Sequence, residues 1–178
     1  NKGVTLIELV IVLAIFTIII SATVNIFISV AKQQRRVLEE QELSSQVSYA
    51  IEYISRTTRT AVKDTTGGCL GSLGYIYLLT HYNLVSGFYG GVKFITKDNN
   101  CWEFFLDTDG VLKEVKNGSQ PQNILSSKFK IKYNRFIING DKNLQQAIGN
   151  GLIQPRVTIS LDIQTEINGD QQGKVFQT

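Results

Sequence analysis

The chain has 178 residues, of which 43% are apolar and 19% charged, and its formal net charge is +3. This length allows one domain plus an anchoring segment but not two full domains. The mild charge gives no reason to expect nucleic acid or an acidic surface as a partner. A single histidine and two cysteines without CxxC spacing argue against a zinc site.

The first feature along the chain is an apolar run from Leu9 to Ala31, 23 residues without a formal charge. As a helix it spans about 34 Å, enough to cross a hydrocarbon core of about 30 Å. The apolar region of a secretory signal has only about 7–15 residues and precedes a small-residue cleavage site. Nothing after Ala31 resembles such a site, so the run predicts a retained membrane anchor. Cations flank it on both sides and do not fix its orientation.

A helical pattern continues beyond the anchor. Residues 32–63 contain neither proline nor glycine, and apolar residues recur at spacings of three and four while the opposite face is polar. The apolar positions are Leu43, Val47, Ala50, Ile51, Ile54, Ala61 and Val62. The pattern predicts one helix from Thr5 to about Lys63, apolar all round in its first half and along one stripe in its second.

After Asp64 the sequence changes to a glycine-rich loop, TTGGCLGSLG, and then to short β-like runs separated by turn-forming groups such as SGFYGG, KDNN and DTDG. The expected strands are Tyr75–Thr80, Val92–Thr96, Trp102–Leu106, Val111–Val115, Phe129–Tyr133 and Val157–Ile163. Asp109 and Gly110 are expected to supply a positive-φ hairpin turn.

These patterns predict an α+β protein in which the helix stripe covers the apolar face of a small antiparallel sheet. The expected division is residues 1–3 as a leader remnant, 4–31 as the transmembrane half of the helix, 32–63 as its amphipathic half, and 64–178 as an exported β-sheet head.

The N-terminal residues carry a family resemblance. One stretch resembles the processing signal of type IV pilins and pseudopilins: Gly3-Val4-Thr5-Leu6-Ile7-Glu8-Leu9-Val10-Ile11-Val12. Three further segments are similar to minor pilins and J-class minor pseudopilins: QQRRVLEEQELSSQVSYAIEYISRTTRTAV, the DG hairpin, and the closing pair PRVTISLDIQT…GKVFQT. Many major pilins have a helix-breaking proline near Ser21, Thr23 and Asn25. This chain has none there, so its helix is expected to be continuous.

The resemblance implies a non-enzymatic subunit of a type IV pilus or type II secretion pseudopilus. Cleavage is expected between Gly3 and Val4, with N-methylation of Val4. Thr5 and Glu8 are the assembly residues, and no cofactor is implied. The implied partners are the prepilin peptidase, other pilin subunits, the platform protein, the ATPase machinery and the membrane. The implied location is the cytoplasmic membrane, with an exported head, and then the filament.

Two other functions stay open: a DNA-uptake pilin, and an exported binding domain that uses a pilin-type signal as its anchor. Glu8 likewise has two explanations. It could extend to the lipid headgroups, or it could pair with the processed amine of a neighbouring subunit, because an unpaired carboxylate within a membrane costs a few kcal/mol.

Three smaller features have competing explanations. Cys69 and Cys101 are expected to form a disulfide if the domain is exported and to be free thiols otherwise. Asp107 and Asp109 are weak calcium candidates, because DTDG resembles the start of a calcium loop but lacks its later ligands; a hairpin turn suffices. Lys128, Lys130 and Lys132 are expected on one strand face, opposite Phe129, Ile131 and Tyr133, and favour protection of an edge strand over DNA binding.

Overall fold

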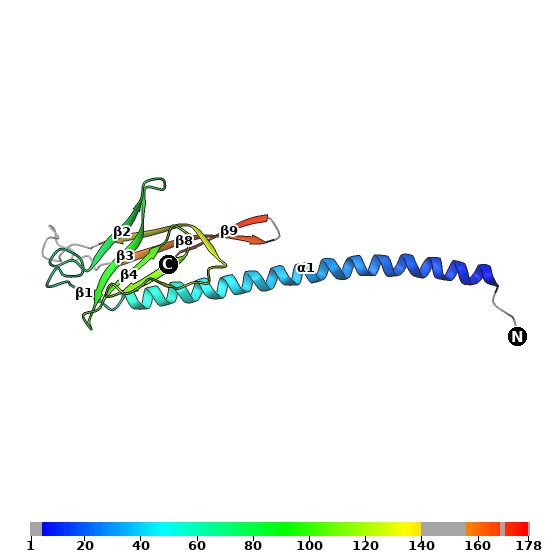
Figure 1. The fold of residues 1–178 in the computed structure, drawn as a ribbon, viewed down its shortest axis with the longest axis horizontal. Helices are drawn as coiled ribbons and strands as arrows, with labels where there is room; N and C mark the ends of the chain where they lie inside the picture. The colour runs from blue at the N-terminus through cyan, green and yellow to red at the C-terminus, as the bar shows by residue number, and fades with distance from the viewer. Residues whose placement is uncertain (1–4, 140–155, 168–169, 178) are drawn as a thin grey trace. The chain divides into compact units, whose positions relative to one another are not determined.

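The computed structural model describes residues 5–139, 156–167 and 170–177. The chain divides into two compact units, Asn1–Glu42 and Leu43–Thr178, and one long helix, α1 (Leu6–Thr58), contributes to both. Figure 1 shows α1 and the strands that follow it. The predicted α+β class, with a long N-terminal helix and an antiparallel sheet, is confirmed.

Helix α1 is continuous through the polar positions Ser21 to Asn25, as the absence of proline predicts. It ends at Thr58, five residues before the predicted end. The hydroxyls of Thr57 and Thr58 donate to carbonyls one turn back, and β-branched threonines are poor helix formers. Ala61 and Val62 instead form a short strand.

The second unit contains two antiparallel sheets. The strands are β1 (Ala61–Val62), β2 (Tyr77–Asn83), β3 (Phe88–Thr96), β4 (Cys101–Leu106), β5 (Leu112–Lys116), β6 (Gln122–Asn123), β7 (Lys130–Asn139), β8 (Arg156–Ile167) and β9 (Asp170–Gln177). The first sheet has the order β1-β3-β4-β5-β6, with β2 also paired to β3. The second has the order β7-β8-β9, and the register of β8 and β9 pairs Leu161 with Phe176.

All six expected strands correspond to observed ones, but β1, β6 and β9 lie outside the six runs. The prediction that SGFYGG is a turn is wrong beyond Gly87, because β3 already begins at Phe88. Gly90 and Gly91 lie within this strand. The sequence also predicts turns at INGDKN and IGNG. The first from residue 140 on, and the whole of the second, lie outside the described residues.

Gly91 is a glycine because three strands come close together at this position. It pairs with Thr80 on β2 and with Phe105 on β4. A Cβ added there would meet Thr80 Oγ1 and stand 3.0 Å from Phe105 Cβ. The glycine therefore has a packing role within the sheet rather than a turn role.

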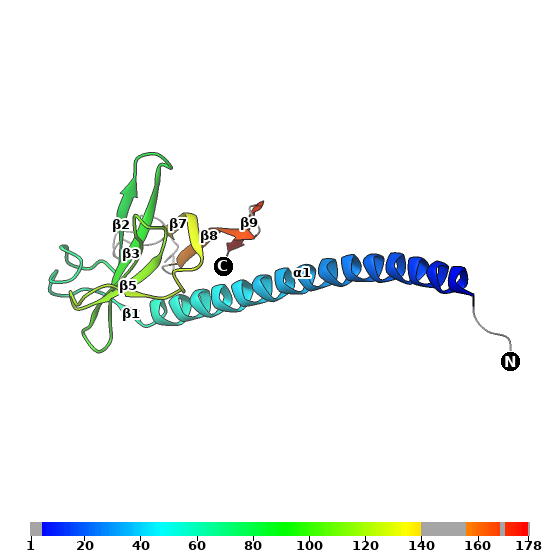
Figure 2. The same cartoon turned by 45° about the vertical axis from the view of Figure 1, so that its right-hand side comes forward.

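One hydrophobic core joins the helix stripe to both sheets. Leu43, Val47, Ala50 and Ile54 of α1 are buried, as the spacing predicts. They cluster with buried residues of β2–β5 and β7–β8 and of the connection between β6 and β7: Tyr77, Val92, Phe94, Phe104, Leu112, Leu125, Phe129, Ile131, Phe136, Ile159, Leu161 and Ile163. Figure 2, a rotated view, shows the strands beside the C-terminal end of α1.

Two hydrogen bonds fix the C-terminal part of α1 against the sheet. Tyr53 Oη donates to Glu114 Oε2 at 2.6 Å, and Tyr77 Oη donates to the Thr58 carbonyl at 2.8 Å. Burial and the Glu114 carboxylate raise the pKa of the Tyr53 phenol, so it stays a donor at neutral pH. The Tyr77 bond satisfies a carbonyl in the last helical turn.

We predict that Gly91→Ala destabilises the head by about 1–3 kcal/mol, because Phe105 Cβ belongs to a paired strand and cannot move away freely. Thermal unfolding of the detergent-solubilised chain, followed by near-UV circular dichroism, measures the effect. Gly68→Ala is the matched control, since its added Cβ lies 3.4 Å from Thr66 Oγ1 and contacts little else. Equal melting temperatures for the two variants would contradict the packing role.

Candidate functional site

The N-terminal end of α1 is the first candidate site. Thr5 caps the helix: its carbonyl accepts the N–H groups of Glu8 and Leu9 at 3.1 and 3.2 Å, and its Oγ1 accepts the Glu8 N–H at 3.4 Å. Thr5 and Glu8 have the T-x-x-E spacing of a capping box. Glu8 lies in the first turn, where the helix dipole favours a negative charge. Gly3 and Val4, the predicted processing positions, lie outside the described residues.

The helix surface after Glu8 is apolar and uncovered. The large apolar side chains from Leu6 to Val30 each expose 45–81% of their surface. Within the described residues, α1 is the one helix long and apolar enough to cross a membrane. A water-soluble monomer rarely exposes so large an apolar surface, so this segment needs lipid or other protein around it.

The polar residues in this apolar segment are satisfied within the helix itself. Thr17 Oγ1 donates to the Leu13 carbonyl at 2.6 Å, and Ser21 Oγ to the Thr17 carbonyl at 2.9 Å. Asn25 Nδ2 donates to the Ser21 carbonyl at 2.9 Å. These bonds lower the cost of placing hydroxyl and amide groups in an apolar environment.

Glu8 is the one charged residue between Thr5 and Ala31. Its backbone N–H is bound by Thr5, but the reciprocal bond of a capping box, from the Thr5 N–H to the Glu8 carboxylate, is not among the hydrogen bonds of the described chain. A cation is the favourable partner, because an isolated carboxylate at membrane depth is costly.

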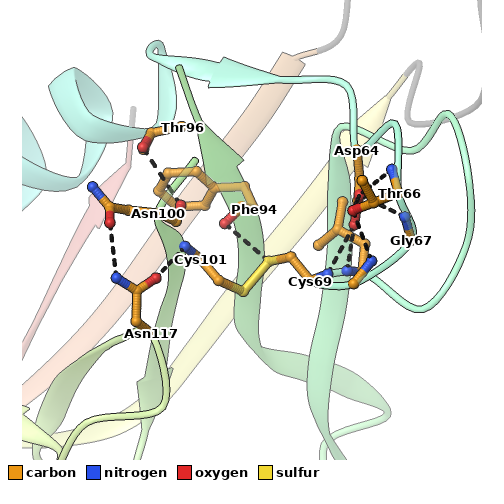
Figure 3. The surroundings of a disulfide bond; sticks show 11 residues. Asp64, Thr66, Gly67, Cys69, Phe94, Thr96, Asn100, Cys101 and Asn117 are labelled. Carbon is orange, nitrogen blue, oxygen red and sulfur yellow. Dashed lines mark hydrogen bonds between the residues drawn. A yellow bond between two sulfur atoms is a disulfide. The ribbon is translucent and has the colours of Figure 1, made fainter. Parts of the chain in front are cut away.

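The second candidate region is the glycine-rich loop after β1, where a disulfide joins Cys69 to Cys101 at the start of β4. Figure 3 shows the bridge and its surroundings. The Cα atoms are 5.6 Å apart. Asn117 Oδ1 accepts the Cys101 N–H at 2.7 Å, and Asn117 Nδ2 donates to Asn100 Oδ1 at 2.8 Å. The bridge thus ties the loop to the β4–β5 end of the sheet.

A buried carboxylate, Asp64, organises the same loop. Its Oδ1 accepts the N–H groups of Thr66 and Gly67, and its Oδ2 accepts those of Cys69 and Leu70, at 2.7–3.1 Å. Burial alone raises the pKa of a carboxyl group, but these four donors outweigh it and lower the pKa of Asp64 to about 2. Figure 3 shows the four donors converging on the carboxylate, beside the disulfide.

Asp107 and Asp109, the weak calcium candidates, lie in the β4–β5 turn. Lys113 Nζ binds Asp107 Oδ2 and lowers the pKa of Asp107, while the Thr108 N–H donates to Oδ1 at 2.8 Å. In the described ranges, no three His, Cys, Asp or Glu side chains form a group that could hold a metal ion. Gly110 takes a positive φ of 72° in the β4–β5 hairpin, so the predicted positive-φ turn at the Asp109-Gly110 pair is present.

The lysine-rich strand differs from its prediction at one position. Ile131 is buried as expected, but Tyr133 is 47% exposed, because a bulge between Ile131 and Tyr133 shifts the register against β8. Asn134 points inward instead, and its Nδ2 donates to the Gly90 carbonyl on β3 at 2.7 Å. Lys130 Nζ binds the Asp109 carbonyl at 2.9 Å.

His81, the single histidine, lies on β2. Its Nε2 is 3.2 Å from Glu103 Oε1, and its ring stacks on Phe105 with the centroids 4.4 Å apart. Its φ of 53° is unusual for a residue other than glycine. These contacts cross from β2 to β4, so they support a role for His81 in sheet packing.

Sequence reasoning missed two features: the Asp64 carboxylate and the exposed tip of the β2–β3 hairpin at Leu84 and Val85. An aspartate directly before TTGG is a signal for a loop held by side-chain-to-backbone bonds. The signal for the hairpin turn is Asn83, with Ser86 and Gly87 three and four residues later, because these residue types favour turns.

Comparison with known proteins supports the first candidate site. Residues 1–24 match the sequence model of the prokaryotic N-terminal methylation motif. The match covers Thr5 and Glu8 and ends within the apolar half of α1. No curated protein and no solved structure gives a significant match to the chain.

We predict that Asp64 makes stability depend on pH. The folded-state pKa of about 2 is below the ordinary value of 3.8, so the stabilisation is complete above about pH 4 and is lost as the pH falls towards 2. Asp64→Asn should remove this slope and cost at least about 1–3 kcal/mol at pH 7, because buried N–H donors lose their acceptors.

The measurement is thermal unfolding of the detergent-solubilised chain between pH 2 and pH 7. Asp98→Asn is the matched control, because Asp98 is exposed in the β3–β4 turn. A parallel pH profile for Asp64→Asn and the unaltered chain would contradict the role of Asp64.

Proposed function

The chain carries a type IV pilin-type N-terminal signal, and from this premise we propose that it is a minor pilin or pseudopilin, a structural subunit of a type IV pilus or a type II secretion pseudopilus. The match of residues 1–24 to the methylation motif is the observation that carries the proposal. In this proposal a prepilin peptidase cleaves between Gly3 and Val4 and methylates the new amine of Val4.

Glu8 receives its partner through this cleavage. Processing creates a positively charged α-amine at Val4, and the N-terminus of a helix adds positive dipole character to it. A neighbouring subunit can thus supply the cation that the Glu8 carboxylate needs at membrane depth. Pairing between subunits fixes their axial register. Thr5 supports the geometry by capping the helix at Glu8.

The surface of α1 supports assembly through helix packing. Before assembly, the apolar side chains from Leu6 to Val30 are suited to the bilayer as a single-pass anchor. Val30, Val37 and Leu38 extend the exposed apolar surface past the anchor, at spacings of seven and eight residues, which place them on one helix face. Helices of other subunits can cover this face in a filament.

The head completes the proposed subunit. It is exported, its disulfide suits an oxidising compartment, and its core uses only the C-terminal part of α1. The further partners in this proposal are other pilins, the platform protein and the assembly ATPase. A DNA-uptake pilin is the competing function; it requires salt-sensitive DNA binding by the chain.

The processing proposal predicts that the protein isolated from cells begins at N-methylated Val4. Intact-mass measurement and N-terminal sequencing test this directly. Gly3→Asp should block cleavage, so that the unprocessed chain accumulates in the membrane, whereas Ser29→Ala, in α1 but beyond the matched residues 1–24, should be processed normally. A natural N-terminus elsewhere, or an unmethylated Val4, would overturn the proposal.

The assembly proposal predicts that Glu8→Gln is processed but fails to join the filament. Glutamine keeps the capping-box chemistry and the size of glutamate and loses only the charge, so the variant separates ion pairing from helix capping. We expect at least a tenfold loss in sheared filament fractions, the order expected from losing about 1.4 kcal/mol of pairing energy. Glu8→Asp should restore part of the incorporation. Normal incorporation of Glu8→Gln would show that the charge is not required.

A further inference from the structure

The β2–β3 hairpin ends in an exposed apolar tip. Leu84 and Val85 expose 89% and 93% of their surface. The tip is well ordered, since Asn83 Oδ1 accepts the N–H groups of Val85 at 2.9 Å and Ser86 at 3.1 Å. Gly87 closes the turn by donating its N–H to the Asn83 carbonyl at 2.9 Å. Figures 1 and 2 both show this hairpin extending past the other strands of its sheet.

Aromatic side chains lie behind the tip on both faces of the hairpin. Tyr82 and Tyr89 are cross-strand partners with ring centroids 5.0 Å apart, and they expose 54% and 38% of their surface. Phe88, paired with Asn83, is 39% exposed on the other face. At the extended rise of about 3.3 Å per residue, Tyr82 lies at most about 7 Å behind Leu84, which is in the turn.

Two cationic side chains, Lys132 and Arg135, lie near the tip; Asp107, which Lys113 binds, lines the hollow that Leu84 shares with Lys132. No aspartate or glutamate occurs between Asp64 and Asp98 in the sequence, a stretch that includes the whole hairpin. The Arg135 guanidinium lies 3.9 Å from the centroid of the Phe88 ring, and Lys132 Nζ lies 5.4 Å from that of Tyr133. Asp162 lines the same surface hollow as Val85, Phe88 and Arg135.

We propose that this hairpin tip binds the surface of an anionic phospholipid bilayer. Leu84 and Val85 enter the edge of the hydrocarbon region, and Tyr82 and Tyr89 lie at the interface, where tyrosine is favoured. Arg135 and Lys132 face the lipid phosphates. The depth of at most about 7 Å between tip and tyrosines agrees with the insertion of about 5–10 Å typical of interfacial segments.

A bilayer fits this surface better than a protein partner does. A protein needs a complementary cavity for two convex aliphatic side chains, whereas a bilayer needs none. Away from the tip, apolar side chains are followed by aromatic and then cationic ones. This order matches the hydrocarbon region, the interface and the phosphate groups of a bilayer. The contact is separate from the anchor in α1 and does not depend on processing or assembly.

The test uses the full chain held in nanodiscs of phosphatidylcholine and mixed with liposomes of phosphatidylglycerol and phosphatidylethanolamine. Flotation measures how much disc-held chain rises with the liposomes, and discs without protein set the baseline. The double variant Leu84→Ser/Val85→Ser should lower liposome binding at least tenfold, because each buried aliphatic side chain contributes about that factor. Leu73→Ser, 69% exposed in the glycine-rich loop, is the matched control and should bind normally.

Two further variants test the chemistry of the contact. Arg135→Gln should weaken binding to the anionic liposomes about fivefold and leave binding to phosphatidylcholine liposomes unchanged. Val85→Trp should show fluorescence quenched by nitroxide-labelled lipids placed only in the liposomes, whereas the native Trp102 signal of the unaltered chain should not.

The proposal is overturned if the unaltered chain does not float, if the double serine variant floats equally well, or if Val85→Trp is not quenched. It is also overturned if the discs associate with one another without liposomes and the double variant abolishes that association, because the tip then binds a second copy of the chain. The serine positions are almost fully exposed, so an unchanged melting temperature verifies that the variant is folded.

Discussion

The structure depends on one stripe of α1, the residues Leu43, Val47, Ala50 and Ile54. This stripe contacts both sheets and makes one core from strands that come from two separate parts of the chain. Neither sheet has another helix to cover its apolar face within the described residues. A small sheet with one uncovered apolar face is not stable in water, so the part of α1 from Leu43 onward and the two sheets fold as a unit. The Tyr53–Glu114 and Tyr77–Thr58 hydrogen bonds then fix the orientation of the helix on the sheet.

The remaining polar contacts hold the edges of this core. Asp64 and the Cys69–Cys101 disulfide close the glycine-rich loop beside β3, and Asn134 joins β7 to β3 through the Gly90 carbonyl. Because the Asp64 carboxylate is fully buried and satisfied by four backbone donors, the loop has a defined shape despite its glycines. The head is thus held by interior contacts, and the apolar side chains at its hairpin tip stay exposed.

The sequence was sufficient to predict the elements whose pattern is local. The periodicity of α1 and the positions of six strands follow from residue spacing. The signal around Glu8 was identified by its resemblance to a known family, which the match of residues 1–24 supports. The features it did not predict depend on contacts between distant residues. From the sequence, Gly90 and Gly91 predict a turn; in the fold they lie in β3, where Asn134 and Phe105 come close to them. The bulge that exposes Tyr133 depends on the pairing of β7 with β8. The early end of α1 has the same origin, since Ala61 and Val62 gain a partner in β3.

The division of α1 explains why a structural role suits this chain. The head uses the helix from Leu43 onward, so the apolar residues from Leu6 to Val30 contribute nothing to the core and remain exposed. Exposed apolar surface of this extent is stable only when lipid or other helices cover it. In the proposed assembly, lipid alone would leave the Glu8 carboxylate without a partner, whereas a neighbouring processed subunit would supply both apolar cover and a cation. The same helix can therefore anchor the subunit in the membrane and later pack in a filament, with the charge of Glu8 favouring the second state.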